Sequence, residues 1–160
     1  MSQEIEIEFK NMLTKQEYNN LLDYYQLTNK KPIIQTNIYF DTLNNDLSNK
    51  LFTLRVRIKN DQIEFTLKQP GNFENIETTD IINKKQLNLL LKKNIIPNGD
   101  VKDRLLMFNI NNSIYPIAHL TTYRYEIDIE QFIIVLDKST YYNHTDYELE
   151  IECQKYNDGQ

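Results

Sequence analysis

Two stretches of the sequence carry a carboxylate at every second position. Glu6 and Glu8 lie near the N-terminus, and Glu148 and Glu150 lie near the C-terminus, each pair separated by one apolar residue. Since successive side chains of a strand point to opposite faces, each pair occupies one face of a predicted strand. Carboxylate oxygens are the ligands that hard divalent cations prefer. The two pairs are therefore typical of a metal-binding wall.

Basic residues show the same alternation in other strand-like stretches. Arg55, Arg57 and Lys59 alternate with apolar residues, as do Lys68 and Arg124. Guanidinium and ammonium groups bind phosphate oxygens through charge-assisted hydrogen bonds. With only 3 glycines, the chain has no glycine-rich phosphate loop, so phosphate must be bound by side chains. Acidic and basic rows together could hold a polyanion and a divalent metal.

The elements that position these residues are predicted strands with one apolar and one charged face. The alternation covers residues 4–10, 54–59, 63–68, 122–130 and 148–152. An ordinary antiparallel sheet with its charged face in water would explain this pattern without any function. A sheet that curls into a barrel with the charged face inward would instead enclose a polar channel. Periodicity alone leaves both arrangements open.

Helices are expected to cover the apolar face. Thr14 and Glu17 form a capping box that begins a helix reaching about Gln26. A second helix is predicted at 84–93 after Asn83, and a shorter third helix follows Asp100. No linker or repeat divides the chain, so residues 1–160 are expected to form a single domain.

Composition excludes several functional classes. The 160 residues are 40% hydrophobic and 26% charged, with a formal net charge of -5. A binder of duplex nucleic acid usually carries a basic excess, so that class is disfavoured. No apolar run is long enough to span a membrane, and the N-terminus does not resemble a signal peptide. With Cys153 as its one cysteine, the protein is expected to be cytoplasmic.

Six short motifs in order resemble the CYTH family, also called triphosphate tunnel metalloenzymes. The first strand, with Glu6, Glu8 and Lys10, fits an ExExK pattern, and the last carries the ExE of Glu148 and Glu150. Between them lie stretches similar to the family's YFDT turn, LRxR strand, lysine strand and arginine strand, and the sixth motif is the closing hairpin, which ends in that ExE pair. They start at Tyr39, Leu54, Phe65, Arg124 and Val135.

The resemblance implies an α+β fold, a closed eight-stranded antiparallel β-barrel with a polar, charged lumen and helices packed outside. It also implies metal-dependent hydrolysis of a triphosphate-containing small molecule, with Mg²⁺ or Mn²⁺ as cofactor. By similarity, Lys10 and Glu8 would be catalytic. The implied metal ligands are Glu6, Glu8, Glu148, Glu150 and Asp137. The implied substrate-binding residues are Lys10, Arg55, Arg57, Lys68 and Arg124.

Departures from the family pattern keep other functions open. Thr122 stands where many members carry a basic residue, and the middle strand offers only Glu77 of the family's charged set. One alternative is an adenylyl cyclase that makes cyclic AMP and pyrophosphate. Another is a module that binds polyphosphate or a nucleotide without turnover, and a third is a structural barrel whose lumen neutralises itself.

Overall fold

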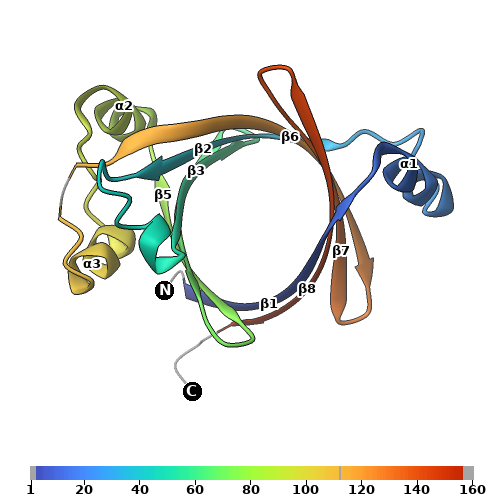
Figure 1. The fold of residues 1–160 in the computed structure, drawn as a ribbon, viewed down its shortest axis with the longest axis horizontal. Coiled ribbons are helices and arrows are strands. Elements are labelled where there is room, and N and C mark those ends of the chain that lie inside the picture. Colours follow the sequence, from blue (N-terminus) through green and yellow to red (C-terminus); the bar gives the residue numbers. More distant parts are fainter. Residues whose placement is uncertain (1–2, 112, 157–160) are drawn as a thin grey trace.

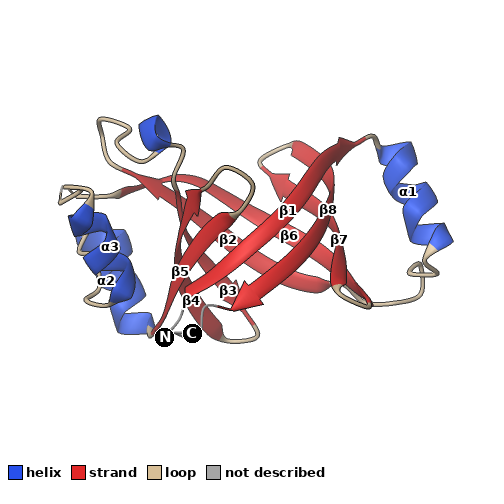
Figure 2. Cartoon of the chain, turned by 90° about the horizontal axis from the view of Figure 1, so that it is seen from below, coloured by secondary structure: helices blue, strands red, loops and turns tan. Residues whose placement is uncertain are grey.

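In a computed structural model, eight strands form one antiparallel sheet with helices outside it (Figures 1 and 2). The structure describes residues 3–111 and 113–156. For residues 4, 6 and 154–156 it describes the backbone but not the side chain. The strands are β1 (Gln3–Leu13), β2 (Ile33–Asp41), β3 (Thr53–Lys59), β4 (Gln62–Pro70), β5 (Asn75–Ile82), β6 (Tyr115–Ile129), β7 (Phe132–Tyr141) and β8 (His144–Tyr156). The helices are α1 (Lys15–Tyr24), α2 (Lys84–Lys93), α3 (Asp100–Met107) and the short 3-10 helix η1 (Ser48–Lys50).

The sheet closes on itself through β1. The strand order is β1-β5-β4-β3-β2-β6-β7-β8, and β1 pairs with both β5 and β8. The β1–β5 ladder is short, because it joins only Gln3–Glu6 to Asn75–Thr78. Over Ile7–Leu13, β1 pairs with β8 and not with β5. The barrel is therefore closed only where β1 pairs with β5. Along the rest of β1 the sheet is open between these two strands and forms a curled half-barrel, which differs from the fully closed barrel that was predicted.

Inward and outward residues alternate as the sequence predicts. Arg55 and Arg57 line the interior of the ring, whereas their neighbours Leu54 and Val56 are buried on the outer face. The apolar outer face of β2–β5 packs under α2 and α3, where Phe65, Leu67, Leu90, Val101 and Leu105 are buried. The charged face is therefore the lumen and not a solvated outer surface.

The helices lie outside the barrel, on two opposite sides of it. Figure 1 looks through the ring and shows α1 on one side and α2 with α3 on the other. Helix α1 begins directly after Thr14, which forms the predicted capping box with Glu17, and Tyr18 packs with Leu136 in a second, smaller core. Helix α2 has the predicted bounds and the Asn83 cap. None of the helices in the described part of the chain is long and apolar enough to cross a membrane.

Helix α3 takes its N-terminal cap from a strand. Gly99, which precedes the helix, has no side chain to cap it. The Asp80 carboxylate on β5 accepts hydrogen bonds from the backbone N–H groups of Asp100 at 3.1 Å and Val101 at 2.9 Å. A Cβ atom on Gly99 would lie 2.5 Å from Asp80 Oδ2, so glycine is required for this close approach. The cap ties α3 to the barrel wall.

The loop after β2 is organised by one carboxylate. Asp41 is buried and accepts hydrogen bonds from the backbone N–H groups of Thr42 at 2.8 Å, Leu47 at 2.9 Å and Ser48 at 3.1 Å. Since a buried carboxylate needs such donors, this turn holds the segment that leads into β3. The YFDT-like stretch is thus a structural turn that positions the Arg55 strand.

Candidate functional site

The lumen holds a cavity of about 530 Å³ lined almost entirely by polar side chains. Nine of the ten site residues predicted from the sequence line it. They are Glu8, Lys10, Arg55, Arg57, Lys68, Arg124, Asp137, Glu148 and Glu150. The tenth, Glu6, has its backbone in β1, but its side chain lies outside the described residues. The topology therefore brings residues from distant parts of the chain to one cavity.

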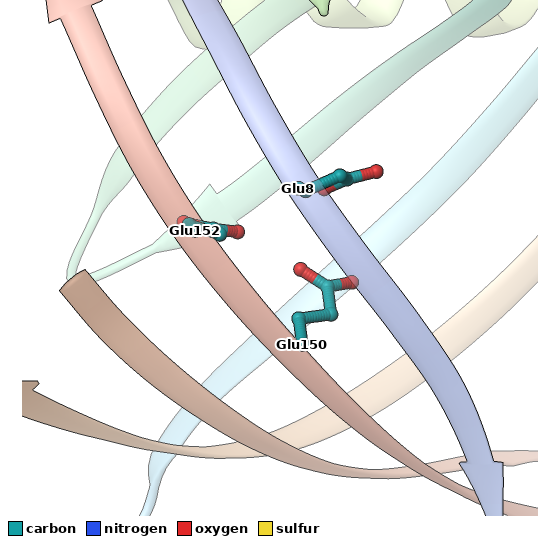
Figure 3. A group of neighbouring side chains, drawn as sticks. All are labelled: Glu8, Glu150 and Glu152. Carbon is teal, nitrogen blue, oxygen red and sulfur yellow. The ribbon is translucent and has the colours of Figure 1, made fainter. Parts of the chain in front are cut away.

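Three carboxylates meet where β1 lies beside β8 (Figure 3). Glu8 is the register partner of Glu152, and Glu150 lies two positions before it on the same strand. One oxygen from each of Glu8, Glu150 and Glu152 lies within 4.8 Å of the others. This spacing and the all-oxygen chemistry fit a hard divalent cation. Glu148 lines the cavity but does not belong to this group of three.

The crowding of these carboxylates shifts their protonation. Burial, the hydrogen bond with Glu150 and repulsion from that carboxylate together raise the pKa of Glu152 to about 8. For Glu150, burial favours the neutral form, but the hydrogen bond from Glu152 and the charge of Lys10 lower its pKa. The repulsion between these two carboxylates disfavours their simultaneous ionisation. A bound cation would remove that repulsion.

Two lysines neutralise part of this acidic wall. Lys68 Nζ donates to Glu8 Oε1 at 2.8 Å and lies 3.8 Å from Glu77. Lys10 Nζ lies 3.5 Å from both Glu148 and Glu150 and 3.8 Å from Glu8. Burial lowers the pKa of Lys10, but the carboxylates of Glu150, Glu148 and Glu8 outweigh that effect and raise it overall. Lys10 therefore stays protonated and cannot serve as a base near neutral pH.

The wall formed by β3 carries positive charge without paired carboxylates. Among the described residues, neither Arg55 nor Arg57 forms an ion pair, and the buried Arg55 Nε has no hydrogen-bond partner. Arg57 Nε donates to Asn37 Oδ1 at 2.8 Å. Burial and the neighbouring charges of Arg55 and Arg124 together lower the pKa of Arg57 to about 10. Such unpaired, crowded guanidinium groups are suited to a polyanion.

Arg124 differs, because it is bound by Asp137. Arg124 Nε and Nη2 donate to the two Asp137 oxygens at 2.8 and 2.7 Å. Burial lowers the pKa of Arg124, but the hydrogen bonds and charge of Asp137 raise it overall. Both Asp137 oxygens accept from Arg124, and Asp137 is not part of the carboxylate group of Glu8, Glu150 and Glu152. Its role as a metal ligand, implied by the family resemblance, stays a prediction.

Some lumen residues were not predicted from the sequence. Glu152 was recognised as part of the acidic strand but was not assigned to the site, although it completes the carboxylate group. Gln35 and Asn37 also line the cavity. Their two-residue spacing on β2 is the signal that could have found them, but neutral amides do not stand out among residues 33–40, none of which is charged.

The comparisons with known proteins agree with this architecture. A family model described as the CYTH domain matches residues 4–160. A Bacillus subtilis (strain 168) relative named "Putative triphosphatase YjbK" is 43% identical over 162 residues, which cover 99% of this chain and 83% of that protein. A Bacillus halodurans crystal structure named as a "putative adenylate cyclase" has a TM-score of 0.90 at 35% identity, covering 95% of this chain and 82% of that one. A Hippeastrum structure, named as a "putative adenylyl cyclase" with a dominant triphosphatase activity, has a TM-score of 0.70 at 20% identity, covering 96% and 80%.

Proposed function

The chain belongs to the CYTH domain family, and from this premise we propose that it is a triphosphatase that hydrolyses a phosphoanhydride bond of a triphosphate bound in its barrel lumen. The observation that carries the proposal is the segregation of charge in one cavity. The group of Glu8, Glu150 and Glu152 lies on the β1–β8 wall, and Arg55 and Arg57 lie on β3. A substrate with a chain of negative charges and a bound cation fits both walls.

Mg²⁺ or Mn²⁺ is the cofactor that this donor set favours. Glu8, Glu150 and Glu152 would hold it, because they offer hard oxygen ligands within 4.8 Å of one another. When bound, the ion would supply Lewis-acid polarisation of a phosphoryl oxygen. Glu148 and Glu6 are the further carboxylates of the same two strands that the family resemblance assigns to this role.

The basic side chains bind and orient the phosphates. Within the described part of the chain, Arg55 and Arg57 have no carboxylate partner, so each guanidinium group can donate to non-bridging oxygens. Lys68 and Lys10 lie at the acidic wall, where they would place a phosphate next to the carboxylates. Because Lys10 remains protonated, its role in catalysis is to stabilise charge that develops on an oxygen and not to remove a proton.

An adenylyl cyclase is the second candidate, because the Bacillus halodurans structure at 35% identity carries that name. A cyclase must bind adenine as well as the triphosphate. Among the described lumen residues, Tyr39 is the one aromatic side chain that lines the cavity. A lumen with so little stacking surface favours recognition of the phosphate chain over recognition of a base.

A substrate panel tests the proposal. Purified protein is incubated with Mg²⁺ or Mn²⁺ and with tripolyphosphate, thiamine triphosphate or ATP, and released phosphate and nucleotide products are measured. We expect phosphate release that Glu8→Gln reduces strongly and that Glu74→Gln, at an exposed carboxylate that does not line the lumen cavity, leaves nearly unchanged. Cyclic AMP and pyrophosphate as the main products would identify a cyclase. Tight binding without any turnover would identify a binding module.

A further inference from the structure

The Gln35 side chain is a buried amide without a hydrogen-bond partner. It is 1% exposed, lines the lumen, and neither its Nε2 nor its Oε1 has a partner among the described residues. Buried polar groups in native proteins are nearly always hydrogen-bonded, so an amide orphaned at both atoms needs an explanation. The exception lies in the cavity proposed to bind substrate.

The neighbours of Gln35 are already occupied with one another. Its cross-strand partner is Thr122 on β6. The Thr122 hydroxyl accepts from Asn37 Nδ2 at 3.1 Å and lies 3.0 Å from Ser139 Oγ. Asn37 Oδ1 in turn accepts from Arg57 Nε at 2.8 Å. Thr122, Asn37 and Ser139 thus use their hydrogen-bonding groups on one another and on Arg57, and the Gln35 amide is not part of this network.

The position of Gln35 is suited to contact with a molecule in the lumen. In the ring order, β2 is the fourth strand from β1 in either direction, so Gln35 lies on the wall opposite the strand that carries Glu8 and Lys10. On its own side, the strands next to β2 carry Arg57 and Arg124. A phosphate chain that spans from the arginines to the acidic wall passes this amide.

We propose that Gln35 is a substrate-contacting residue: its Nε2 donates to a non-bridging phosphate oxygen, while its Oε1 accepts a hydrogen bond from a water molecule or hydroxyl group beside that phosphate. The inference rests on the proposed function, because it takes the lumen ligand to be a triphosphate. An amide provides both a donor and an acceptor without charge, which neither the arginines nor the carboxylates of the lumen can do. Gln35 therefore orients a phosphate that the charged side chains bind.

A ligand-binding role and a structural role predict opposite effects on stability. If the amide supported the fold, its removal would lower the melting temperature of the ligand-free protein. If it awaits a ligand, Gln35→Leu removes an unpaired buried group and leaves that melting temperature equal or higher. The same change would weaken the stabilisation that a bound triphosphate confers.

The experiment compares wild type, Gln35→Leu and Gln35→Glu, with Thr78→Val as a matched control. Thr78 is also buried, its hydroxyl oxygen has no hydrogen-bond partner among the described residues, and it does not line the lumen. Melting temperatures are measured in chelator and again with tripolyphosphate and Mg²⁺, and kcat and KM are measured with tripolyphosphate. For Gln35→Leu we expect an unchanged or higher melting temperature in chelator, a smaller shift with ligand, and a loss of about tenfold to a hundredfold in kcat/KM.

The two variants and the control separate the outcomes. Gln35→Glu keeps the acceptor but adds a negative charge beside phosphate, so its loss of kcat/KM should exceed that of Gln35→Leu, whereas Thr78→Val should match wild type in both kinetic constants. A lower melting temperature of Gln35→Leu in chelator with unchanged kcat/KM would overturn the inference. If wild type gains no stability from tripolyphosphate and Mg²⁺ and releases no phosphate, the proposed triphosphatase function is itself wrong. The inference about Gln35, which depends on a bound triphosphate, is then wrong as well.

Discussion

Asp137→Asn is the most informative single change, because it separates a structural ion pair from a metal ligand. In the structure both Asp137 oxygens accept from Arg124, at 2.8 and 2.7 Å, and the two side chains are only 6% and 11% exposed. Removing one partner of a buried ion pair costs about 3–5 kcal/mol. Since Asn retains one acceptor oxygen, we expect a loss near the lower end, about 3 kcal/mol.

The expected change in melting temperature follows from the size of the chain. For a domain of this length, about 2–4 °C is lost per kcal/mol, so Asp137→Asn should melt about 6–12 °C below wild type. The loss should appear in chelator, because it arises from the uncompensated Arg124 charge near Arg57. Tripolyphosphate should restore part of it, since a bound polyanion neutralises both guanidinium groups.

Thermal unfolding followed by circular dichroism, in chelator and with tripolyphosphate, measures both effects. Glu126→Gln is the control, because Glu126 is an exposed lumen carboxylate whose replacement should change the unfolding free energy by no more than about 0.5 kcal/mol. The reasoning is refuted if Asp137→Asn is as stable as wild type in chelator but loses the stabilisation that Mg²⁺ or Mn²⁺ confers. That result would make Asp137 a metal ligand.

Three other changes test the carboxylate group, the α3 cap and the core. The pKa of Glu152 is raised from 4.5 to about 8 in the folded protein, so between these two pH values the folded protein keeps a proton that the unfolded chain has lost. Stability in chelator should therefore fall as pH rises through this range. Glu152→Gln should flatten that dependence in melting curves at pH 6 and pH 8.5, and an unchanged slope would contradict the assignment. Asp80→Ala removes the cap of α3 and should cost about 1 kcal/mol in urea unfolding, whereas an equal stability would show that the cap contributes nothing. Leu90→Ala opens a cavity in the outer core and should cost about 2–5 kcal/mol, with kcat retained if the lumen is independent of that core.

Much of the fold could be predicted from local patterns. The alternation of Arg55 and Arg57 with apolar neighbours predicted both the strand and its two faces, and β3 carries them as expected. The capping box of Thr14 and Glu17 predicted where α1 begins, and Asn83 as a cap predicted where α2 begins. These features depend on residues a few positions apart, so the sequence contains the interacting groups within one short window.

The candidate site was predicted as a set of residues but not as a set of contacts. Glu8, Glu150 and Lys68 line one cavity as the family resemblance implied. The bidentate pairing of Asp137 with Arg124 and the inclusion of Glu152 in the carboxylate group were not foreseen. Both depend on cross-strand register, which places Arg124 opposite Asp137 and Glu8 opposite Glu152. A shift of one residue in either ladder would have turned these side chains to the other face.

By itself the sequence determined which side chains carry charge, which strand faces they share and where the helices begin, because these properties follow from residue type and short-range periodicity. Only the tertiary structure decided that the charged face is a lumen, since burial of the apolar face against α2 and α3 and the short β1–β5 ladder fix the direction of curling. It also decided which charges are paired and that, among the residues the structure describes, the Gln35 amide lies near them without a hydrogen-bond partner. Those outcomes depend on distances between strands far apart in the chain, and they are set when the sheet closes.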